Sequence, residues 1–385
     1  MKILLIVHYK FEPNSGAAGV IWKLGQYYQQ LGHQVQYYSL DNLPDWLPEL
    51  AKIVLFPWFV ALHIGKLARC QAVDVVDSST GDTWLWSTIG QHLSKNPPAI
   101  IVRDHGLDSI EHQEFLKDVR LGKRPMSWKY PLYRGSIRLW EEATALRQAD
   151  LVLLLNRPTL EYAIENLKVD KQKTQLIING IPENFLNLPY QPLNIEGNPT
   201  IQIAQIGTYI PRKGIQYSVP ALNKILHRYP QVKVTFLGTQ CRECPDVEQV
   251  YADFDPKLRD RVTVIPRYPH KQLPNLLQNH QIKLLPSTCE AFGMALVEAM
   301  ACGLAPIVTA TPGPMEIVTH DRDGIVILPR NSEAIVNALE RLLTNYDDLE
   351  RLRHNAHATA QKYSWGKIAK DTLNLYDKIS ANIAK

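Results

Sequence analysis

Two glutamates lie eight residues apart in a run of small and apolar residues, CEAFGMALVEAMACG (289–303). Apolar helices are usually buried, and a buried carboxylate is costly unless it is paired or binds a ligand. If one helix carries both Glu290 and Glu298, a rise of about 1.5 Å per residue separates them by roughly 12 Å. This exceeds the roughly 5–9.5 Å between the paired carboxylates of hydrolytic sugar chemistry. The spacing therefore favours contacts with the two ends of one elongated ligand.

Such a ligand would offer hydroxyl groups to both carboxylates and a charged middle to the amides near Phe292 and Gly293. The alternative is structural, with Glu290 as a helix cap and Glu298 in a buried ion pair.

Two cations lie at the predicted start of a helix in IGTYIPRKG (206–214). A strand is expected to end at Ile206, a glycine turn follows, and a helix begins near Gly214. Because the helix macrodipole disfavours cations at this end, the placement of Arg212 and Lys213 makes sense if an anion binds there. Two solvated surface cations are the alternative.

A histidine and a glycine loop follow predicted strands of the first half of the chain. In VRDHGLD (102–108), His105 comes directly after a strand, where ligands of parallel sheets bind. A structural histidine is the alternative. The loop FEPNSGAAGV (11–20) lacks a full GxGxxG, but Gly16 would let backbone N–H groups meet a diphosphate.

Short apolar runs alternate with helical patterns along the chain, which is typical of parallel sheets with crossover helices. The predicted strands are 3–7, 35–39, 73–77, 99–102, 151–155 and 175–178, then 201–206, 232–237, 262–265, 282–285, 305–308 and 325–328. Between the two series, residues 186–200 are rich in Pro, Asn and Gly and are interpreted as a linker.

The sequence thus predicts an α/β protein with two doubly wound, Rossmann-like domains that face a central cleft. The domains are residues 1–185 and 201–365, and an amphipathic helix over 366–385 follows the second.

Composition narrows the classes of protein to which this chain can belong. A net charge of +4 gives no support to nucleic-acid binding, and five cysteines without a regular framework suit a reducing compartment. The start, MKILLIVHYK, is interpreted as a buried strand rather than a signal peptide. The apolar run 53–65 is shorter than the roughly 20 residues of a membrane span, and Pro57 is expected to break it as a helix. We therefore expect a cytoplasmic protein; its oligomeric state is left open.

Residues 117–138 contain seven cations and one carboxylate, interleaved with Trp128, Tyr130 and Tyr133. Cations and interfacial aromatic residues indicate a contact with an acceptor or with the inner membrane surface. A solvated irregular segment is the alternative.

Three short motifs are discounted. The single CxxC at 241–244 lacks partners for a zinc site. The DxD patterns at 253–255 and 321–323 are short enough to occur by chance, and the second is interpreted as an acidic turn before a strand.

Together these segments resemble the family-4 (group 1) retaining glycosyltransferases of the GT-B fold, over nearly the whole chain. The glycine loop with its helix, IINGIPENF (177–185), IGTYIPRKG and the closing YSWGKIAKDTLNLYDKI (363–379) each resemble family segments. The most specific match is PSTCEAFGMALVEAMACGLAPIVTATPGPMEIV (286–318), which is similar to the family's E-x7-E block. The terminal helix is expected to cross back to the first domain.

The resemblance implies transfer of a sugar from a UDP-, GDP- or ADP-sugar to a hydroxyl acceptor, with retention, without a cofactor and without a catalytic metal. Its implied catalytic residues are His105, Arg212, Lys213 and Glu290. Its implied donor-binding residues are Gly16, Gly207, Thr208, Arg212, Lys213, Tyr268, Glu290, Phe292, Gly293, Met294 and Glu298. We expect acceptor contacts from Asp82, Arg103 and Asp104.

Within this set, the resemblance assigns the ribose to Glu298, the donor sugar to Glu290 and the diphosphate to the two cations. The chain departs from the family at Thr208, where arginine is frequent, and at Ser15, where glycine is frequent. Either Arg212 takes over the missing charge or diphosphate binding is weaker than usual.

Two other functions remain open. A sugar-nucleotide epimerase would need carboxylates close to the sugar ring, which the predicted separation of Glu290 and Glu298 disfavours. A non-catalytic nucleotide-sugar-binding protein would not need the combination of these carboxylates with Arg212 and Lys213.

Overall fold

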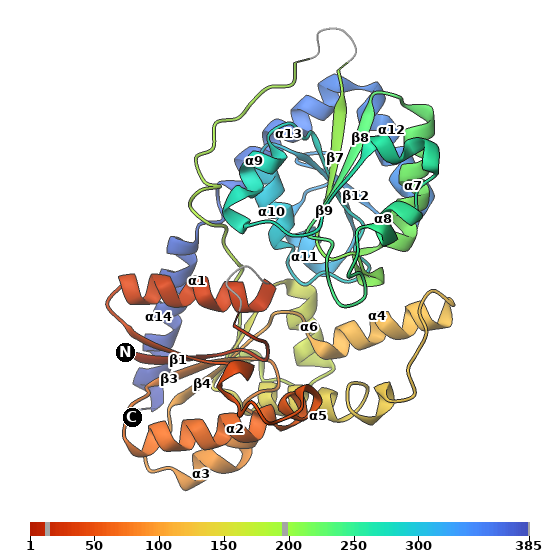
Figure 1. The fold of residues 1–385 in the computed structure, drawn as a ribbon. Coiled ribbons are helices and arrows are strands. Elements are labelled where there is room, and N and C mark those ends of the chain that lie inside the picture. The colour runs from red at the N-terminus through yellow and green to blue at the C-terminus, as the bar shows by residue number, and fades with distance from the viewer. Residues whose placement is uncertain (12–15, 195–198, 384–385) are drawn as a thin grey trace. The chain divides into compact units, whose positions relative to one another are not determined.

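The computed structural model describes residues 1–11, 16–194 and 199–383 (Figure 1). The chain forms two compact units, one of Met1–Asn179 with Trp365–Lys385 and one of Gly180–Ser364. Each unit is an α/β structure built on one parallel sheet, as the sequence predicts.

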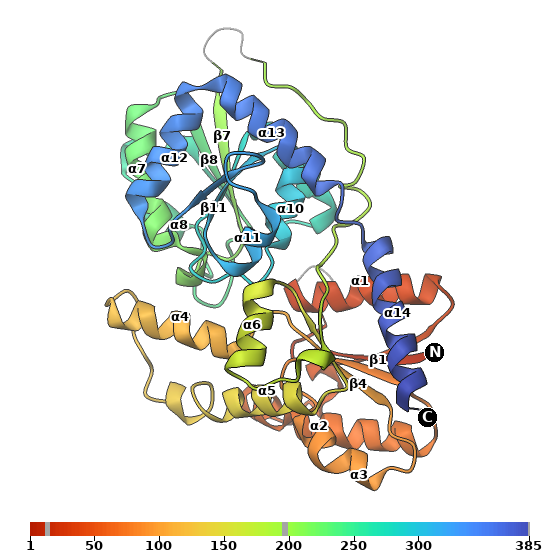
Figure 2. The same cartoon turned by 180° about the vertical axis from the view of Figure 1, so that it is seen from behind.

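The sheet of the first unit has six parallel strands in the order β2-β1-β3-β4-β5-β6. The strands are β1 (Lys2–Ile6), β2 (Gln34–Tyr38), β3 (Val75–Ser79), β4 (Ala99–Arg103), β5 (Leu151–Leu154) and β6 (Thr174–Leu176). The helices are α1 (Gly16–Gln30), α2 (Glu49–Arg69), α3 (Gln91–Leu93), α4 (Asp108–Arg120), α5 (Ile137–Gln148), α6 (Arg157–Glu165) and α14 (Trp365–Ile383). A π-helical turn, η2 (Trp86–Gly90), precedes α3. Helices α1 and α14 cover one face of the sheet and α2 and α5 the other (Figures 1 and 2).

The sheet of the second unit is also six-stranded and parallel, in the order β12-β11-β10-β7-β8-β9. The strands are β7 (Ile201–Ile206), β8 (Val232–Leu237), β9 (Val262–Ile265), β10 (Ile282–Leu285), β11 (Ala305–Thr309) and β12 (Ile325–Ile327). The helices are α7 (Ile215–Arg228), α8 (Glu248–Ala252), α9 (Leu273–Leu277), α10 (Met294–Ala301), α11 (Pro312–Ile317), α12 (Ser332–Thr344) and α13 (Tyr346–Ala360). Short 3-10 turns include η5 (Pro211–Lys213), η6 (Pro256–Arg261) and η7 (His270–Gln272).

All twelve predicted strands are present, with ends shifted by two residues at most. They were predictable because strands of a parallel sheet are covered on both faces and therefore form continuous apolar runs. Strand β4, for example, is buried along its whole length. The terminal helix, α14, packs on α1 and β4 of the first unit, which confirms the predicted return of the chain.

The segment that leads into the second unit differs from the expected boundary. Residues 180–185 belong to the second unit, because Ile181 pairs with Ser364 and the buried Phe185 ring lies 5.5 Å from His270. Part of the predicted linker is also docked on α13, where the Tyr190 hydroxyl and the Leu193 N–H both donate hydrogen bonds to the Glu350 carboxylate. The Pro- and Asn-rich composition indicated irregular backbone, but irregular backbone can be well packed.

Helix α2 corrects the expectation for residues 53–65. It runs without interruption over Glu49–Arg69 with Pro57 inside it, and it is long and apolar enough to cross a membrane. The proline removes one backbone hydrogen bond. Packing of Phe56, Val60 and Ile64 against the sheet offsets this cost.

Candidate active site

The loop after β7 brings two cations to the start of α7, as predicted. Gly207 and Gly214 both have positive φ, at +129° and +73°, and Thr208 between them is half-buried. A Cβ at Gly214 would lie 1.9 Å from the Pro286 carbonyl oxygen, so this position requires glycine. Because of this close approach, the turn at Arg212 and Lys213 packs directly against the loop that follows β10.

Lys213 and Glu290 form an ion pair between these two loops, with Nζ 2.6 Å from Oε2. The Ser287 hydroxyl donates to the same oxygen at 3.2 Å. Burial opposes the charged carboxylate, but the Lys213 and Arg212 charges outweigh it and lower the pKa of Glu290. The loop is fixed further by Thr288, whose N–H donates to the Arg212 carbonyl at 2.9 Å. Glu290 is therefore an anion held against two cations.

Glu290 does not share a helix with Glu298, which corrects the basis of the 12 Å estimate. Helix α10 begins at Met294, because Gly293 adopts a left-handed conformation with φ +102°. The loop before it is pinned by Gly313, where an added Cβ would lie 2.5 Å from the Phe292 backbone nitrogen. In the first turn of α10, the Leu296 and Val297 N–H groups donate to the Gly293 carbonyl at 2.9 and 3.3 Å. The N–H groups of Met294 and Ala295 are therefore the ones that can donate to a ligand next to the Glu290 loop.

Glu298 is buried in α10 and accepts a hydrogen bond from His270 Nε2 at 2.9 Å. His270 lies in η7, two residues after Tyr268. Burial and the Glu298 charge together raise the pKa of Tyr268. Tyr268 packs on Gly238, where an added Cβ would lie 3.4 Å from its ring. A second cluster, of Tyr268, His270 and Glu298, thus lies beside the first.

Sequence reasoning missed His270 and Lys283. Lys283 is fully buried on β10 and donates from Nζ to the Leu284 carbonyl at 3.1 Å. Burial, and then the charge of Lys213, lower its pKa to about 7, against the opposing effect of Glu290 and Glu298. The available signal was a lysine inside the apolar run IKLL, since lysine is rarely buried without a partner.

The groups of this site follow β7, β9 and β10, at the carboxyl ends of strands of one parallel sheet in which β10 and β7 are neighbours and β8 separates β7 from β9. This is the edge at which doubly wound sheets bind ligands. Arg212, Lys213 and the N-terminus of α10 can bind an anion. Glu290 and Glu298 can accept hydrogen bonds from hydroxyl groups.

In the first unit, His105 and Asp104 follow β4 as predicted. Gly106 has φ +125°, and its N–H donates to Asp104 Oδ1 at 2.6 Å. Burial raises the pKa of Asp104 to about 6. Burial and the Arg103 charge lower the pKa of His105 to about 3, so its imidazole is neutral at pH 7. Its Nε2 has no hydrogen-bond partner in the part of the chain that the structure describes.

Asp82 lies in a buried charge network at the same edge of the sheet. Its Oδ1 accepts from His8 Nδ1 at 2.6 Å and from Arg138 at 3.4 Å. Arg138 also donates to Asp108 at 2.8 Å and packs so closely on Gly81 that a Cβ there would lie 2.7 Å away. The Asp82 Oδ2 atom has no partner among the described residues, so it can still accept a hydrogen bond.

Arg103 has a different role from the predicted acceptor contact. Its buried guanidinium donates to Asp77 at 2.7 Å and to the Tyr376 hydroxyl at 3.2 Å. Tyr376 in turn donates to Asp77. Arg103 therefore joins β4 to β3 and α14, because its side chain points away from the polar edge into the sheet–helix contact.

Gly16 begins α1, and an added Cβ there would meet no described atom within 4 Å. The rest of the predicted diphosphate loop, residues 12–15, lies outside the described residues.

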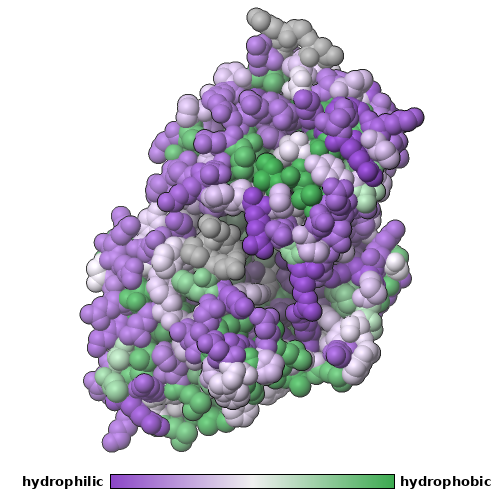
Figure 3. All heavy atoms as spheres, viewed as in Figure 1, coloured by the Kyte–Doolittle hydropathy of each residue, from purple (hydrophilic) through white to green (hydrophobic). Residues whose placement is uncertain are grey.

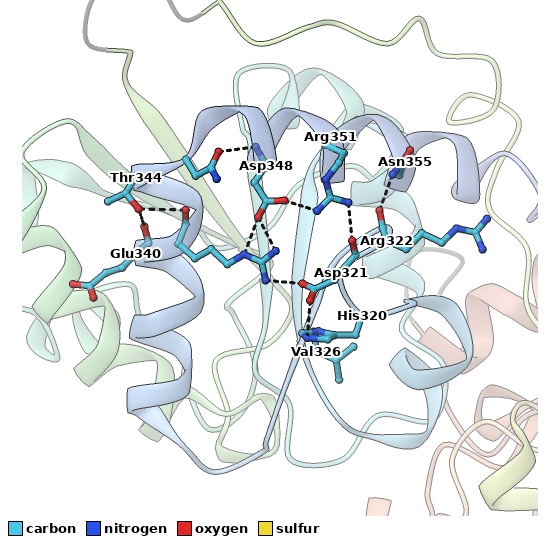
Figure 4. A network of polar contacts seen from close by, with 11 residues as sticks. His320, Asp321, Arg322, Val326, Glu340, Thr344, Asp348, Arg351 and Asn355 are labelled. Carbon is cyan, nitrogen blue, oxygen red and sulfur yellow. Dashed lines mark hydrogen bonds and ion pairs between the residues drawn. The ribbon is translucent and has the colours of Figure 1, made fainter.

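The discounted DxD motifs have structural partners. Asp321, at a turn before β12, accepts from Arg341 at 2.6 Å, and Arg351 donates to its carbonyl (Figure 4). Asp323 accepts from the Thr319 N–H at 2.7 Å. In the other motif, Asp253 accepts from the Tyr209 hydroxyl and Asp255 caps η6. Cys241 and Cys244 of the CxxC are free thiols.

Comparison with known proteins shows which family of enzymes this chain belongs to. The family model for glycosyl transferases group 1 matches residues 190–359, and that for glycosyltransferase family 4 matches residues 14–185. The chain belongs to the group 1 glycosyltransferases.

Similar proteins extend this result. An uncharacterised glycosyltransferase, MJ1607 of Methanocaldococcus jannaschii, is 29% identical over 58% of this chain and 59% of its own length. The structure of sucrose-phosphate synthase from Thermosynechococcus elongatus matches with a TM-score of 0.77 and 21% identity, over 99% of this chain and 100% of that one. Anabaena HepE in complex with UDP matches with a TM-score of 0.71 and 18% identity, over 98% and 100%. These likenesses show the two-domain GT-B fold.

Proposed function

We propose that this glycosyltransferase moves a sugar from a nucleoside diphosphate sugar to a hydroxyl acceptor with retention of anomeric configuration. The Lys213–Glu290 pair carries the proposal, because it places a cation for the leaving diphosphate beside a carboxylate for the sugar. The UDP held by HepE, a protein of the same fold, supports a nucleotide donor.

In this proposal the diphosphate binds Arg212, Lys213 and the first-turn N–H groups of α10. Diphosphate oxygens compete with Glu290 for the Lys213 ammonium, so donor binding frees the carboxylate to accept hydrogen bonds from the sugar. The ribose hydroxyls bind Glu298, which His270 orients through its 2.9 Å hydrogen bond. Phe292, Gly293 and Met294 offer backbone contacts, and Tyr268 lies on the nucleoside side with Gly207 and Thr208.

The chemical step breaks the bond between the anomeric carbon and the diphosphate oxygen and forms the bond to the acceptor oxygen on the same face. The departing phosphate oxygen takes the acceptor proton. Developing negative charge on the diphosphate is stabilised by the two cations and the helix N-terminus. Because these groups supply the positive charge, we propose that the reaction needs neither a metal nor another cofactor.

The first unit is proposed to bind the acceptor, and the second the donor. The neutral His105 imidazole, the Oδ2 atom of Asp82 and the Asp104 carboxyl, all at the polar edge of the first sheet, would contact the acceptor or the donor sugar. Residues 117–138 would add an acceptor or lipid contact, and we place the chain in the cytoplasm.

A nucleotide screen tests the proposal. Thermal unfolding is measured with UDP, GDP and ADP, and the matching sugar nucleotides are then incubated with a panel of hydroxyl acceptors, with and without a chelator. We expect one nucleotide to raise the melting temperature and its sugar to be transferred at the same rate in chelator. An isomeric nucleotide sugar formed without acceptor would indicate an epimerase. Donor binding without turnover would indicate a binding protein.

A further inference from the structure

Helix α2 is apolar on two opposite faces. The inward face, formed by Phe56, Val60, Ile64 and Ala68, packs into the core of the first unit. The outward face carries Leu55, Trp58 and Leu62, which are 38%, 52% and 72% exposed. Their spacing of three and four residues aligns them on one stripe. The core does not explain this second stripe.

The outward stripe belongs to a wider apolar surface. Ile89 in η2, Leu93 in α3, and Ile137 and Trp140 in α5 are also exposed. The Trp84 ring joins the two sides, because its centroid lies 6.3 Å from that of Trp58 and 4.9 Å from that of Trp140. We call these seven exposed residues (Leu55, Trp58, Leu62, Ile89, Leu93, Ile137 and Trp140) the α2 surface. In the space-filling view, apolar side chains gather along the lower edge of this unit, where α2 and α3 lie (Figures 1 and 3).

Cations border the apolar stripe. Lys66 and Arg69 continue the spacing of Trp58 and Leu62 along the outward side and are exposed. Glu49 is the single acidic residue of α2, lies at the opposite end and is paired with Lys10 at 3.0 Å. The leucine and tryptophan side chains fit the boundary between the acyl chains and the headgroups of a bilayer. The two cations that follow them along the helix fit the headgroups of anionic lipids.

We propose that the α2 surface docks this protein on an anionic membrane, with α2 in the plane of the interface. Although α2 is long enough to cross a bilayer, only its outward side is available, because Phe56, Val60 and Ile64 are part of the core. A spanning helix would remove these residues from the sheet. The geometry therefore indicates a peripheral contact.

The surface adjoins the proposed acceptor edge. Asp82 is two residues before Trp84, and Arg138 is two residues before Trp140, so the charge network and the α2 surface share these two segments. If the proposed function holds, the acceptor is a hydroxyl compound with a lipid anchor. Membrane docking itself does not depend on that reaction.

Flotation with vesicles tests the docking. The probe is phosphatidylcholine vesicles with or without phosphatidylglycerol, and the test variants are Leu62→Glu with Leu93→Glu, and Lys66→Glu with Arg69→Glu. We expect wild-type protein to bind the anionic vesicles, and each double variant to bind at least about tenfold more weakly. Salt at roughly 1 M should abolish the contribution of the cations to vesicle binding.

Matched controls lie in the second unit. Leu328 is also an exposed leucine, and Lys257 and Lys362 are exposed lysines. Leu328→Glu, and Lys257→Glu with Lys362→Glu, should bind like wild type. Thermal unfolding verifies that each variant is folded, and Leu55→Glu replaces any that is not.

Three outcomes would overturn the proposal. Wild-type protein could fail to float with anionic vesicles. Binding could be lost in Trp128→Glu and kept in the α2 variants, which would move the contact to the segment around Trp128. A wild-type dimer in solution that Leu62→Glu with Leu93→Glu converts to a monomer, without vesicle binding, would make the surface an interface between copies.

Discussion

Two paired carboxylates explain why an apolar segment carries charge. Glu290 is balanced by Lys213, and Glu298 accepts a hydrogen bond from His270. Both partners come from other loops of the same sheet edge, so the cost of burial is offset before any ligand arrives. A donor that brings its own charge and hydroxyl groups would exchange with these partners.

Removal of the Lys213 ammonium should slow the chemical step. We expect Lys213→Ala to lower kcat by roughly 10²–10³-fold, because it removes one charge that stabilises the leaving diphosphate. It should also weaken binding of the free nucleoside diphosphate. The control is Lys224→Ala on α7, which removes an exposed ion pair between Lys224 and Glu333, 2.9 Å apart. Steady-state kinetics at wild-type values for Lys213→Ala would remove this residue from the mechanism.

Loss of the Glu298 carboxylate should weaken nucleotide affinity without a large effect on kcat. Glu298→Ala removes a contact to the ribose, with an expected cost of roughly 1–3 kcal/mol. Calorimetric titration of the preferred nucleoside diphosphate measures this cost, and Glu248→Ala, an exposed glutamate on α8, serves as control. An unchanged dissociation constant would contradict the assignment of Glu298 to the ribose.

Lys283 should make stability depend on pH. Its pKa is about 7 in the folded protein and about 10.4 in an unfolded chain, so the unfolded state binds more protons between these values. The free energy of unfolding should therefore rise as pH increases from about 7 to 10. Lys283→Met should remove this rise and stabilise the protein at pH 7 by about 1–4 kcal/mol. Denaturant titrations at several pH values test this, and parallel curves for the two proteins would refute it.

At the scale of elements, glycines in left-handed conformations set where the helices of the site begin. Gly214 ends η5 before α7, and Gly293 precedes α10. The start of α10 was not predicted from the sequence, because a glycine inside an apolar run is compatible with a continuous helix. The start of α7 near Gly214 was predicted, because a glycine turn follows the strand that ends at Ile206.

The close contact at Gly214 should be costly to disturb. Gly214→Ala combines an unfavourable φ with a Cβ 1.9 Å from the Pro286 carbonyl oxygen. Gly122 also has positive φ, at +67°, but an added Cβ there meets no described atom within 4 Å. We expect Gly122→Ala to cost about 1 kcal/mol and Gly214→Ala clearly more. Equal free energies of unfolding for the two variants would show that the β7–α7 loop moves freely away from Pro286.

Strands were more predictable from the sequence than the contacts of the site. A strand covered on both faces needs a continuous apolar run, and such a run is visible locally. The partnership of His270 with Glu298 joins residues 28 positions apart and has no local pattern. Pro57 gave a misleading local signal, because tertiary packing keeps α2 helical through it.

At the scale of the whole molecule, the chain returns to its first unit after it has built the second. It leaves the first unit at Asn179, builds the second, and comes back at Trp365 with α14. The Arg103–Asp77–Tyr376 contact fixes the returning helix to the sheet of the first unit. The terminal helix was predictable from its amphipathic pattern, and its destination was implied by the family resemblance.

The anomeric configuration of the product is the most direct test of the proposed reaction. Proton NMR, recorded early after mixing enzyme, acceptor and an α-linked nucleotide sugar that the thermal screen selects, distinguishes the two anomers. In the proposed reaction, the acceptor bond forms on the same face of the sugar from which the diphosphate leaves, bound by Lys213 and Arg212. This predicts an α-linked product. A β-linked product would contradict retention and the roles given to these residues.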